Sequence, residues 1–418
     1  MVGCAGASIA PGEELSSPPA VGAEAAKPGL VEPSQVPSPN PAVDSGAPAE
    51  ALAQQADNLE DGRPVRPASI PSVEKAGEKS EPASPAPTVA QPLAALMYLW
   101  FGFDLDTGNS IGGLKSSHWN TDLGIGSRVG VTDEPAYGFY ASDDPAVIGQ
   151  QLASMEEAGI GTIIVSWHGW GDINFDGNVD DKEKEAMQRA LIALMDYISS
   201  TNAPFKVAVL VEPFMVDPPG LTLVQKQQIL DFLWDNVYNV YPAFMFDWET
   251  NPLLVTWSNV DLKEPADGRF TVKSWSSTDN PNWKADTSLD WNWYPDVTLV
   301  EGTISDDGVI VLFPRFDEYW MYIMGKDLGH DYRRVDPLLE DQIYGQAWQV
   351  AVDNKDDISL ILLYTWNEHE EHAAIEPDKG ISPVSYGNSL IEKTSRYYRQ
   401  FLAGQNIVNP SPGTSRIR

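Results

Sequence analysis

An apolar segment near the C-terminus is followed at once by a cluster of acidic side chains. The segment covers residues 358–365, and the acids Glu368, Glu370, Glu371 and Glu376 come shortly after its end. Hydrolysis of a glycosidic bond needs one protonated carboxyl group to assist the leaving group and one carboxylate to act on the sugar. Neighbouring charges move the pKa values of two such groups apart, which gives each group its role. The cluster is therefore a candidate for paired-acid chemistry on a carbohydrate.

Two other interpretations of this cluster are open from the residues alone. Glutamate-rich turns are commonly solvated surface loops, and His369 with His372 adds imidazole groups that could bind a metal ion. The spacing of His369, Glu370 and His372 differs from the recognised zinc-protease motifs, which disfavours metal catalysis.

A second cluster of oxygen-bearing side chains has the spacing of an EF-hand calcium loop. In residues 172–183, Gly177 stands at the position of the sharp turn and Glu183 at that of the bidentate last ligand. Asn178 would contribute its backbone carbonyl, and Asp180 would bind directly or through water. The predicted calcium ligands are Asp172, Asn174, Asp176, Asn178, Asp180 and Glu183.

The role expected for this calcium ion is structural. The loop directly follows Trp167-His168-Gly169-Trp170, so a bound ion would brace the rim of an active site rather than take part in the reaction. The alternative is an acidic surface loop at the N-terminus of a helix, where the macrodipole favours Asp and Glu. No organic cofactor is expected.

Polar and aromatic residues stand just past the ends of several predicted strands, where parallel α/β barrels assemble their active sites. Glu212 is a candidate for binding substrate hydroxyl groups or, alternatively, a buried partner of Arg315. Five tryptophans fit either stacking on sugar rings or packing in the core; they are Trp100, Trp119, Trp167, Trp170 and Trp366.

Strand and helix patterns alternate along most of the chain after Pro92. Buried-strand patterns begin at Leu93 and cover residues 160–167, 206–211 and 358–365, and a further apolar segment lies near residues 243–247. Helical patterns cover residues 144–158, 182–199, 222–237, 338–352 and 390–402. This alternation implies a parallel sheet. The polar residues past several strand ends favour a closed (β/α)₈ TIM barrel over an open sheet.

The pattern breaks over residues 258–335, which are rich in Trp, Asn and Asp. A hairpin is predicted around Ser305-Asp306-Asp307-Gly308. The sequence does not locate strands five to seven of the barrel, which would lie in this part of the chain. No internal repeat of fixed period is visible.

The first part of the chain has the composition of a disordered stalk. Residues 5–87 consist mainly of Pro, Ala, Ser, Glu and Gly, which cannot bury enough apolar area to fold. The start Met1-Val2-Gly3-Cys4 resembles the end of a bacterial lipoprotein signal, so Cys4 is a candidate lipid anchor. The alternative is a lone cysteine in a disordered terminus. We predict a stalk over 1–91, one barrel domain over 92–405 and a flexible tail over 406–418.

The charge of the chain restricts its partners. The net charge is −33, from 60 acidic and 27 basic residues, and it repels phosphate groups and anionic lipids. Nucleic acid is therefore not an expected partner. No apolar run is long enough for a transmembrane helix, so membrane contact is expected only through the lipid anchor. We expect an extracytoplasmic monomer that is secreted or held at the cell surface.

The acid cluster resembles the signature Trp-Asn-Glu-Trp-His-Glu-Gly-Thr-Gln-Ile-Glu-Pro of glycoside hydrolase family 99, the endo-α-mannosidases and endo-α-mannanases. The matching residues are Trp366, Asn367, Glu368, Glu371, Ile375, Glu376 and Pro377. Other segments resemble the family in the same order; they are Tyr98-Leu99-Trp100-Phe101-Gly102, His118-Trp119, residues 140–145, residues 158–167 and Val211-Glu212-Pro213-Phe214. The similarity spans most of residues 96–403.

The resemblance implies a retaining, endo-acting hydrolase of α-linked oligosaccharides or polysaccharides on a (β/α)₈ barrel. It implies that Glu368 is the base acting on the sugar 2-hydroxyl, that Glu371 is the general acid/base, and that a 1,2-anhydro sugar is the intermediate. The substrate-binding set that we expect is Tyr98, Trp100, His118, Trp119, Trp167, Glu212, Trp366 and Asn367.

The chain departs from the signature at His369 and Glu370, which replace Trp and His, and at His372-Ala373-Ala374, which replace Gly-Thr-Gln. The main rival function is a glycan-binding or polysaccharide-assembly barrel without hydrolytic activity, because a fold alone does not imply a function. A calcium-dependent adhesion protein is a third interpretation. The presence of both Glu368 and Glu371 favours an enzyme.

Overall fold

The structure, a computed structural model, describes residues 92–113, 116–121, 128–129, 134–172, 178–179, 181–212, 221–257, 260, 262–277, 291–293, 304–317, 340–379 and 386–408. The chain divides into two units, residues 1–80 and 81–418, and all of the described residues belong to the second unit. The predicted stalk with Cys4 and residues 409–418 of the predicted tail lie outside the described residues.

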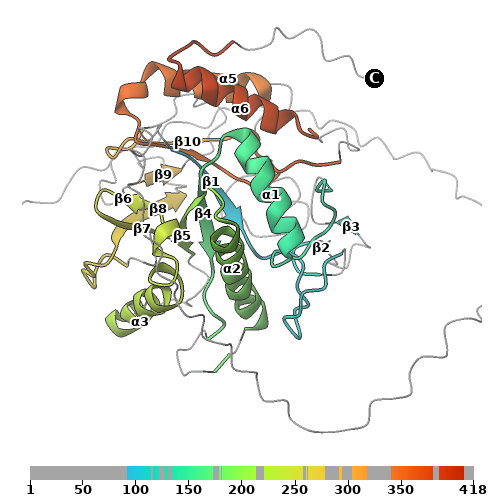
Figure 1. Cartoon of the computed structure of the whole chain (residues 1–418), viewed down its shortest axis with the longest axis vertical. Coiled ribbons are helices and arrows are strands. Elements are labelled where there is room, and N and C mark those ends of the chain that lie inside the picture. Colours follow the sequence, from blue (N-terminus) through green and yellow to red (C-terminus); the bar gives the residue numbers. More distant parts are fainter. Residues whose placement is uncertain are drawn as a thin grey trace, which may run out of the picture. The chain divides into compact units, whose positions relative to one another are not determined.

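Parallel strands form the centre of this second unit (Figure 1). In the order of sheet neighbours they are β10 (Val309–Leu312), β11 (Leu360–Leu363), β1 (Leu93–Tyr98), β4 (Thr162–Trp167), β5 (Lys206–Val211), β7 (Asn251–Trp257), β8 (Thr271–Ser277) and β9 (Trp291–Trp293). The short β6 (Asp247–Trp248) pairs antiparallel with β7. A separate antiparallel pair joins β2 (Asn120–Thr121) and β3 (Arg128–Val129).

Strand β1 lies between β4, the next parallel strand of the chain, and β11, the last one. The other neighbours follow in chain order, which is the strand order of a (β/α)₈ barrel with one pair of neighbours left open. In the described residues no pairing joins β9 to β10, and residues 294–303 between these strands lie outside that part. The predicted parallel α/β sheet is confirmed, and closure of the barrel stays a prediction.

Helices connect the strands, and local side chains define where these helices begin. They are α1 (Pro145–Ala158), α2 (Lys182–Thr201), α3 (Leu223–Leu233) with the π-helical turn η2 (Trp234–Tyr238), the 3₁₀ turns η3 (Pro242–Phe244) and η5 (Lys355–Asp357), α5 (Glu340–Asp353) and α6 (Ser389–Leu402). Asp144, Asp181 and Thr222 accept hydrogen bonds from the first backbone N–H groups of α1, α2 and α3. Helix α1 ends at Gly159, whose φ of 89° is readily adopted by glycine.

Alternation along the strands divides the buried side chains into two layers. In β1, Leu93, Ala95 and Met97 pack in the layer that also contains the buried faces of α1 and α2. The intervening Ala94, Leu96 and Tyr98 belong to a second cluster on the opposite face of the sheet. Because side chains in a strand alternate between faces, this division applies to each strand in turn.

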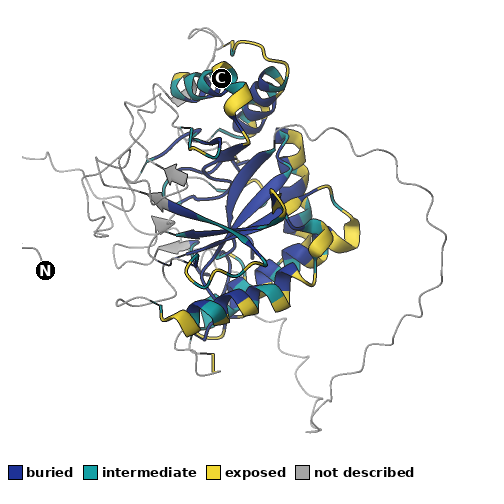
Figure 2. Cartoon of the chain, turned by 90° about the vertical axis from the view of Figure 1, so that its left-hand side faces the viewer, coloured by how far each residue is buried: buried dark blue, intermediate teal, exposed yellow. Residues whose placement is uncertain are grey.

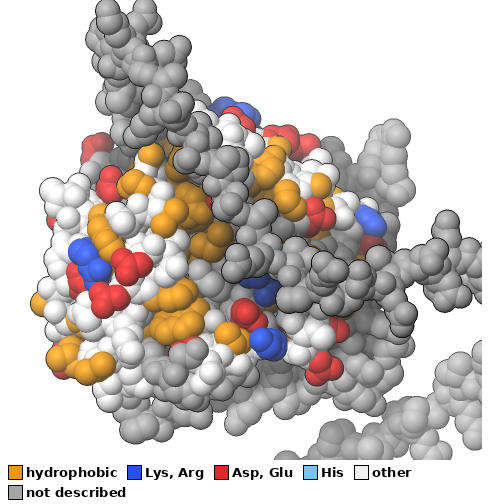
Figure 3. Space-filling view, turned by 60° about the horizontal axis from the view of Figure 1, so that its bottom comes forward, with side chains coloured by type: hydrophobic (Ala, Val, Ile, Leu, Met, Phe, Trp, Pro, Cys, Tyr) orange, Lys and Arg blue, Asp and Glu red, His pale blue; other side chains and the backbone are white. Residues whose placement is uncertain are grey.

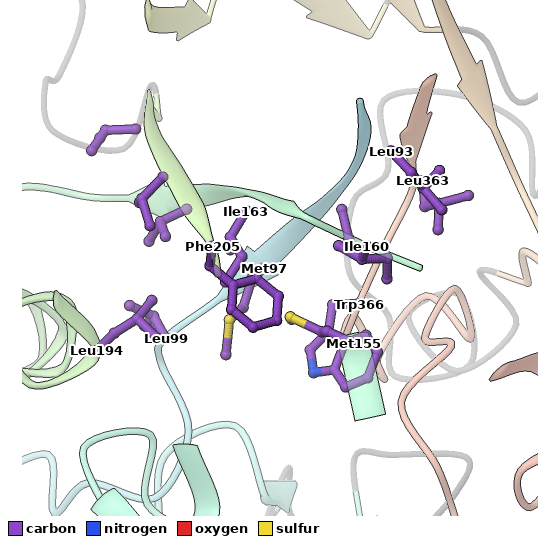
Figure 4. Close-up of a cluster of buried hydrophobic side chains, with 14 of the residues drawn as sticks. Leu93, Met97, Leu99, Met155, Ile160, Ile163, Leu194, Phe205, Leu363 and Trp366 are labelled. Atoms are coloured by element: carbon purple, nitrogen blue, oxygen red, sulfur yellow. The ribbon is translucent and has the colours of Figure 1, made fainter. Parts of the chain in front are cut away.

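The layer between the sheet and the helices holds large apolar side chains. Figure 4 shows Met97 of β1 and Met155 of α1 in this layer, together with Trp366, which follows β11. Burial of each such side chain stabilises the fold by about 1.5–3 kcal/mol. Figure 2 shows the central strands of the sheet buried, while exposed residues lie on the outer sides of the helices and in turns. On the face in Figure 3, acidic and basic side chains lie among hydrophobic ones.

Most of the predicted elements form within a few residues of their expected bounds. The main difference is β7, which lies after the apolar segment expected near residues 243–247; that segment contains part of η3 and the start of β6. Strands β8, β9 and β10 fall in the region where the pattern broke. Of the predicted hairpin, the turn at residues 305–308 forms, with Gly308 N donating to Ser305 O at 2.8 Å, and a single antiparallel bridge joins Ile304 to Ile310. None of the helices in the described ranges combines the length and the apolar character that a membrane span requires.

Candidate active site

Four polar side chains lie on one face of the sheet, at the carboxyl ends of four adjacent strands. Tyr98 ends β1 and pairs in register with Ser166 of β4. Glu212 follows β5, two residues after Leu210, and Tyr364 follows β11, two residues after Leu362. Leu210 and Leu362 belong to the same cluster as Tyr98. The period of two along each strand therefore brings these four side chains to the same face and edge.

Three carboxyl groups act electrostatically on Tyr98. Burial raises the pKa of the Tyr98 hydroxyl well above its usual value, and three negative charges add to the shift, those of Glu212, Glu368 and Glu371. A hydrogen bond with Tyr364 acts in the opposite direction. The acids that follow β5 and β11 thus converge around the end of β1, and Tyr98 stays protonated at neutral pH.

Glu371 receives a direct hydrogen bond from a neighbouring tyrosine. The Tyr364 hydroxyl donates to Glu371 Oε2 at 2.6 Å. Burial raises the pKa of Tyr364 well above its usual value, and the charge of Glu371 adds to the shift. The backbone carbonyl of Glu371 accepts from Asp317 N at 2.8 Å, which ties the acid to the segment after β10. Glu371 is half-buried and is held from both its side chain and its backbone.

Glu368 is buried, with 3% of its surface exposed, and its position depends on short local contacts. Its backbone N–H donates to Thr365 Oγ1 at 2.7 Å. Its carboxylate Oε1 accepts from Glu370 N at 3.0 Å. These two contacts fix the orientation of the Glu368 backbone and of its carboxyl group.

Glu212 lies in a buried polar chain with Ser166 and His168. Ser166 Oγ donates to Glu212 Oε1 at 3.0 Å and lies 3.1 Å from His168 Nε2. Burial raises the pKa of Glu212 to about 8; the hydrogen bond from Ser166 opposes this shift and the charge of Glu371 adds to it. Burial also lowers the pKa of His168 to about 3, so this imidazole stays neutral. Arg315, the alternative partner of Glu212, instead donates to Ala374 O at 2.7 Å.

Trp100 forms an aromatic stack at this end of the sheet. Its ring lies 4.2 Å from the Tyr98 ring and 4.3 Å from the His118 ring, centroid to centroid. The side chain is half-buried, and within the part of the chain that the structure describes its indole N–H has no hydrogen-bond acceptor. Trp100 therefore places an aromatic ring beside the acids, with its indole N–H buried.

His118 links the acid cluster to the predicted calcium loop. Its Nε2 lies 3.2 Å from Glu183 Oε1, and its Nδ1 lies 3.4 Å from Glu370 Oε1. Burial alone would lower the pKa of His118, but the hydrogen bonds and charges of these two glutamates outweigh burial and raise it to about 9. The imidazolium form bridges two carboxylates.

Four of the predicted substrate-binding residues are core residues in this structure. Trp119, Trp167, Trp366 and Asn367 are between 0% and 1% exposed. Trp119 and Trp167 also use their indole N–H groups internally, on Tyr140 O at 2.6 Å and on Gln188 Oε1 at 2.5 Å. These side chains expose almost no surface in this structure, which favours packing, and their predicted contact with a sugar stays a prediction. Tyr98, Trp100, His118 and Glu212 lie beside the acids, and their contact with a sugar likewise stays a prediction.

The predicted calcium loop is described only in part. Asn174, Asp176, Gly177 and Asp180 lie outside the described residues. Asp172 is buried, and Asp181 N donates to Gly171 O at 2.9 Å, which closes the loop at its base. No group of three or more possible metal ligands occurs among the described residues. The buried Asp172 and the position of Glu183 on the first turn of α2 fit the ends of a calcium loop.

The histidines of the acid cluster point to different partners. His369 Nε2 lies 2.8 Å from Glu376 Oε2, whereas His372 Nε2 lies 3.4 Å from Arg315 Nη1. Both side chains are buried. They do not converge on a common point with Glu370, so the metal-site interpretation of this cluster is wrong.

Sequence reasoning missed two residues that complete the site, Tyr364 and Ser166. Tyr364 belongs to the apolar segment 358–365. It stands two residues after the buried Leu362, and this spacing indicates that both side chains face the same side of the sheet. Ser166 had the same signal, two residues after Ile164. A period-two count to the end of each strand would have identified both.

The fold resembles solved structures of one enzyme. These are two structures of the family 99 endo-α-mannosidase from Bacteroides thetaiotaomicron, one of them in complex with BIS-TRIS-propane. The complex matches with a TM-score of 0.53 and 16% identity, and the other structure with 0.54 and 15%. Each match covers 76% of this chain and 99% of the other. No protein-family model and no curated protein matches the chain. At this identity the likeness shows the fold.

Proposed function

We propose that the protein is a retaining, endo-acting glycoside hydrolase of the endo-α-mannosidase type, built on a closed (β/α)₈ barrel. The observation that carries this proposal is the convergence of Glu212, Glu368 and Glu371 around Tyr98 at the carboxyl ends of parallel strands. Carboxyl groups crowded in a largely buried site titrate apart, so that one can hold a proton while another is ionised.

In the proposed reaction Glu371 protonates the glycosidic oxygen and Glu368 removes the proton from the sugar 2-hydroxyl. The bond between C1 and the leaving oxygen breaks as O2 closes on C1, which gives a 1,2-anhydro sugar. Glu371, now ionised, then takes a proton from water, and the resulting hydroxide opens the three-membered ring at C1. Glu368 returns its proton to O2, so both acids regain their starting states.

The contacts of the two acids support this division of roles. Glu368 accepts the backbone N–H of Glu370, which fixes the orientation of its carboxyl group. Glu371 is more exposed and accepts the Tyr364 hydroxyl, a donor that stabilises the carboxylate formed after proton transfer to the leaving group. Trp100 is the proposed aromatic contact to the sugar, because it is half-buried beside the acids, where Tyr98 and His118 hold its ring in place.

The proposal extends to calcium and to location. A Ca²⁺ ion bound by the loop 172–183 would hold Glu183, and with it the start of α2, beside the site. His118 would then keep its contact with Glu370. We also propose that a monomer acts outside the cytoplasm, carried on the stalk and anchored by lipid at Cys4. Mass spectrometry of the protein purified from membranes tests the anchor directly.

A glycan screen tests the proposed activity. The wild type is incubated with α-mannans and with other polysaccharides, and the products are separated by size and analysed by mass spectrometry. We expect internal cleavage by the wild type and its loss in Glu371→Gln and Glu368→Gln, with both variants retaining the wild-type melting temperature. Tight binding of a glycan without cleavage by the wild type would favour the binding-protein alternative instead.

A further inference from the structure

A fully buried polar network lies beneath the candidate acids. Its members are Tyr140, Gln151, Asn367, His369 and Glu376, each with at most 5% of its surface exposed. Three of them belong to the loop that carries Glu368 and Glu371, one belongs to α1, and Tyr140 precedes α1. Polar groups this deep are costly unless each finds a partner, so their connections define one arrangement.

Glu376 is the common acceptor of this network. Its Oε1 accepts from Gln151 Nε2 at 2.7 Å. Its Oε2 accepts from the Tyr140 hydroxyl at 3.0 Å and lies 2.8 Å from His369 Nε2. A carboxylate can accept at both oxygens and donates nothing, so three donors from different segments can point at this one group.

A chain of hydrogen bonds connects Glu376 to strand β1. Because Tyr140 donates its proton to Glu376, its oxygen is left to accept from Asn367 Nδ2, at 3.2 Å. The same Nδ2 donates to Tyr98 O at 2.9 Å, and Asn367 Oδ1 accepts from Tyr98 N at 2.8 Å. The Asn367 amide therefore clamps the backbone of Tyr98, the residue around which the three carboxyl groups gather.

Backbone bonds connect the network to the acids themselves. Glu376 N donates to Trp366 O at 2.8 Å, and Ala373 N donates to Glu368 O at 2.9 Å. The loop is thereby folded back on itself between Trp366 and Glu376, with both candidate acids inside the fold. A shift of Glu376 would move the same backbone that holds Glu368.

We propose that Glu376 is a positioning residue, whose buried carboxylate orients Tyr140, Asn367 and His369 and so fixes the acid-bearing loop against β1. Glu376 touches no substrate in this role, because it is 1% exposed. The kinetic part of this inference rests on the proposed hydrolase activity, whereas its structural part does not.

The test compares Glu376→Gln with Tyr140→Phe and with a control, Tyr344→Phe. In Glu376→Gln one of the two acceptor oxygens becomes an NH₂ group, which is itself a donor. At least one of the three groups that now bond to Glu376 would then lose its acceptor. Tyr140→Phe removes the link between Glu376 and Asn367 and keeps the carboxylate. Tyr344→Phe removes a buried hydroxyl that bonds Thr394 at 2.8 Å between α5 and α6, and so reports a general loss of stability.

We expect kcat to fall by about tenfold to hundredfold in Glu376→Gln and Tyr140→Phe, because small displacements of reacting groups have effects of this size. KM should stay within about twofold, since no sugar contact is removed. The Tyr344→Phe control should keep the wild-type kcat. If Glu376→Gln does not fold, Tyr140→Phe alone decides the kinetic comparison.

Hydrogen exchange of the Tyr98 amide provides a readout that needs no activity. This amide donates to Asn367 Oδ1, so its exchange should accelerate in Glu376→Gln and Tyr140→Phe and stay unchanged in Tyr344→Phe. A wild type that cleaves no glycan would refute the proposed function, and the exchange data would still decide the positioning role. Unchanged Tyr98 exchange in both network variants, or an unchanged kcat in an active enzyme, overturns the inference.

Discussion

The hydroxyl of Tyr364 and the carboxylate of Glu371 are joined by a 2.6 Å hydrogen bond, although the two residues are seven positions apart. Tyr364 directly follows β11, and Glu371 lies on the loop after it. The bond holds the carboxylate whose charge acts on both Tyr98 and Glu212. It is therefore the contact whose removal should affect the proposed acid most directly.

Tyr364→Phe should lower kcat/KM by about tenfold or more. A hydrogen bond to a charged group contributes about 1.5–3 kcal/mol, and 1.4 kcal/mol corresponds to a factor of ten in rate. Steady-state kinetics on the cleaved glycan measure the effect, with Tyr344→Phe as a buried tyrosine remote from the acids. Equal losses in both variants would attribute the effect to stability instead of to Glu371.

Glu212→Gln should change the pH dependence of stability. The pKa of Glu212 is raised in the folded protein, from an ordinary value of 4.5 to about 8. The folded state therefore keeps a proton that the unfolded state releases, and its contribution to stability, complete below about pH 4.5, is lost as pH rises to 8. The slope is at most about 1.4 kcal/mol per pH unit.

Urea unfolding at pH 5, 7 and 9 measures this contribution. We expect the wild type to lose more stability than Glu212→Gln between pH 5 and 9, so that the variant gains relative to the wild type at alkaline pH. Glu156→Gln, an exposed carboxyl group on α1, is the matched control and should follow the wild type. Parallel curves for the wild type and Glu212→Gln would show that Glu212 is ionised throughout.

Trp100 and Trp366 should respond differently to substitution, although both follow a strand in the same way. Trp100→Ala removes a half-buried ring beside the acids and should raise KM with a small change in stability. Trp366→Phe alters a side chain with 0% exposure in the core and should lower the free energy of unfolding by about 1–2 kcal/mol with KM unchanged. Thermal unfolding and glycan titration of both variants separate the two roles. A raised KM in Trp366→Phe would restore it as a substrate contact.

Removal of calcium should lower the melting temperature of the wild type. A ligand that binds only the folded state at about 100 times its Kd stabilises by about 2.7 kcal/mol. The shift between Ca²⁺ and EGTA should be lost in Glu183→Gln. Glu185→Gln, a change to the other acid in the first turn of α2, should keep it. If EGTA leaves the melting temperature of the wild type unchanged, the prediction of a calcium-binding loop is refuted.

Much of the fold could be predicted from local patterns. Buried apolar runs located β1, β4, β5 and β11, and amphipathic periodicity located α1, α2 and α6, because burial on one face leaves a period that can be read from residue types. Strand β7 was missed because it stands directly after the short β6, with no helix between the two strands. The pattern gave no separate sign of two strands there.

The candidate site, like the fold, could be predicted from the sequence only in part. The sequence alone determined that acids and aromatic rings follow several parallel strands, because strand ends and residue types are local properties. Only the tertiary structure decided which of them meet. It brought Tyr364 to Glu371, placed Trp366 and Asn367 in the core, and separated His369 from His372. The direction of a side chain depends on packing between segments that are distant in the chain, and no local pattern encodes that packing.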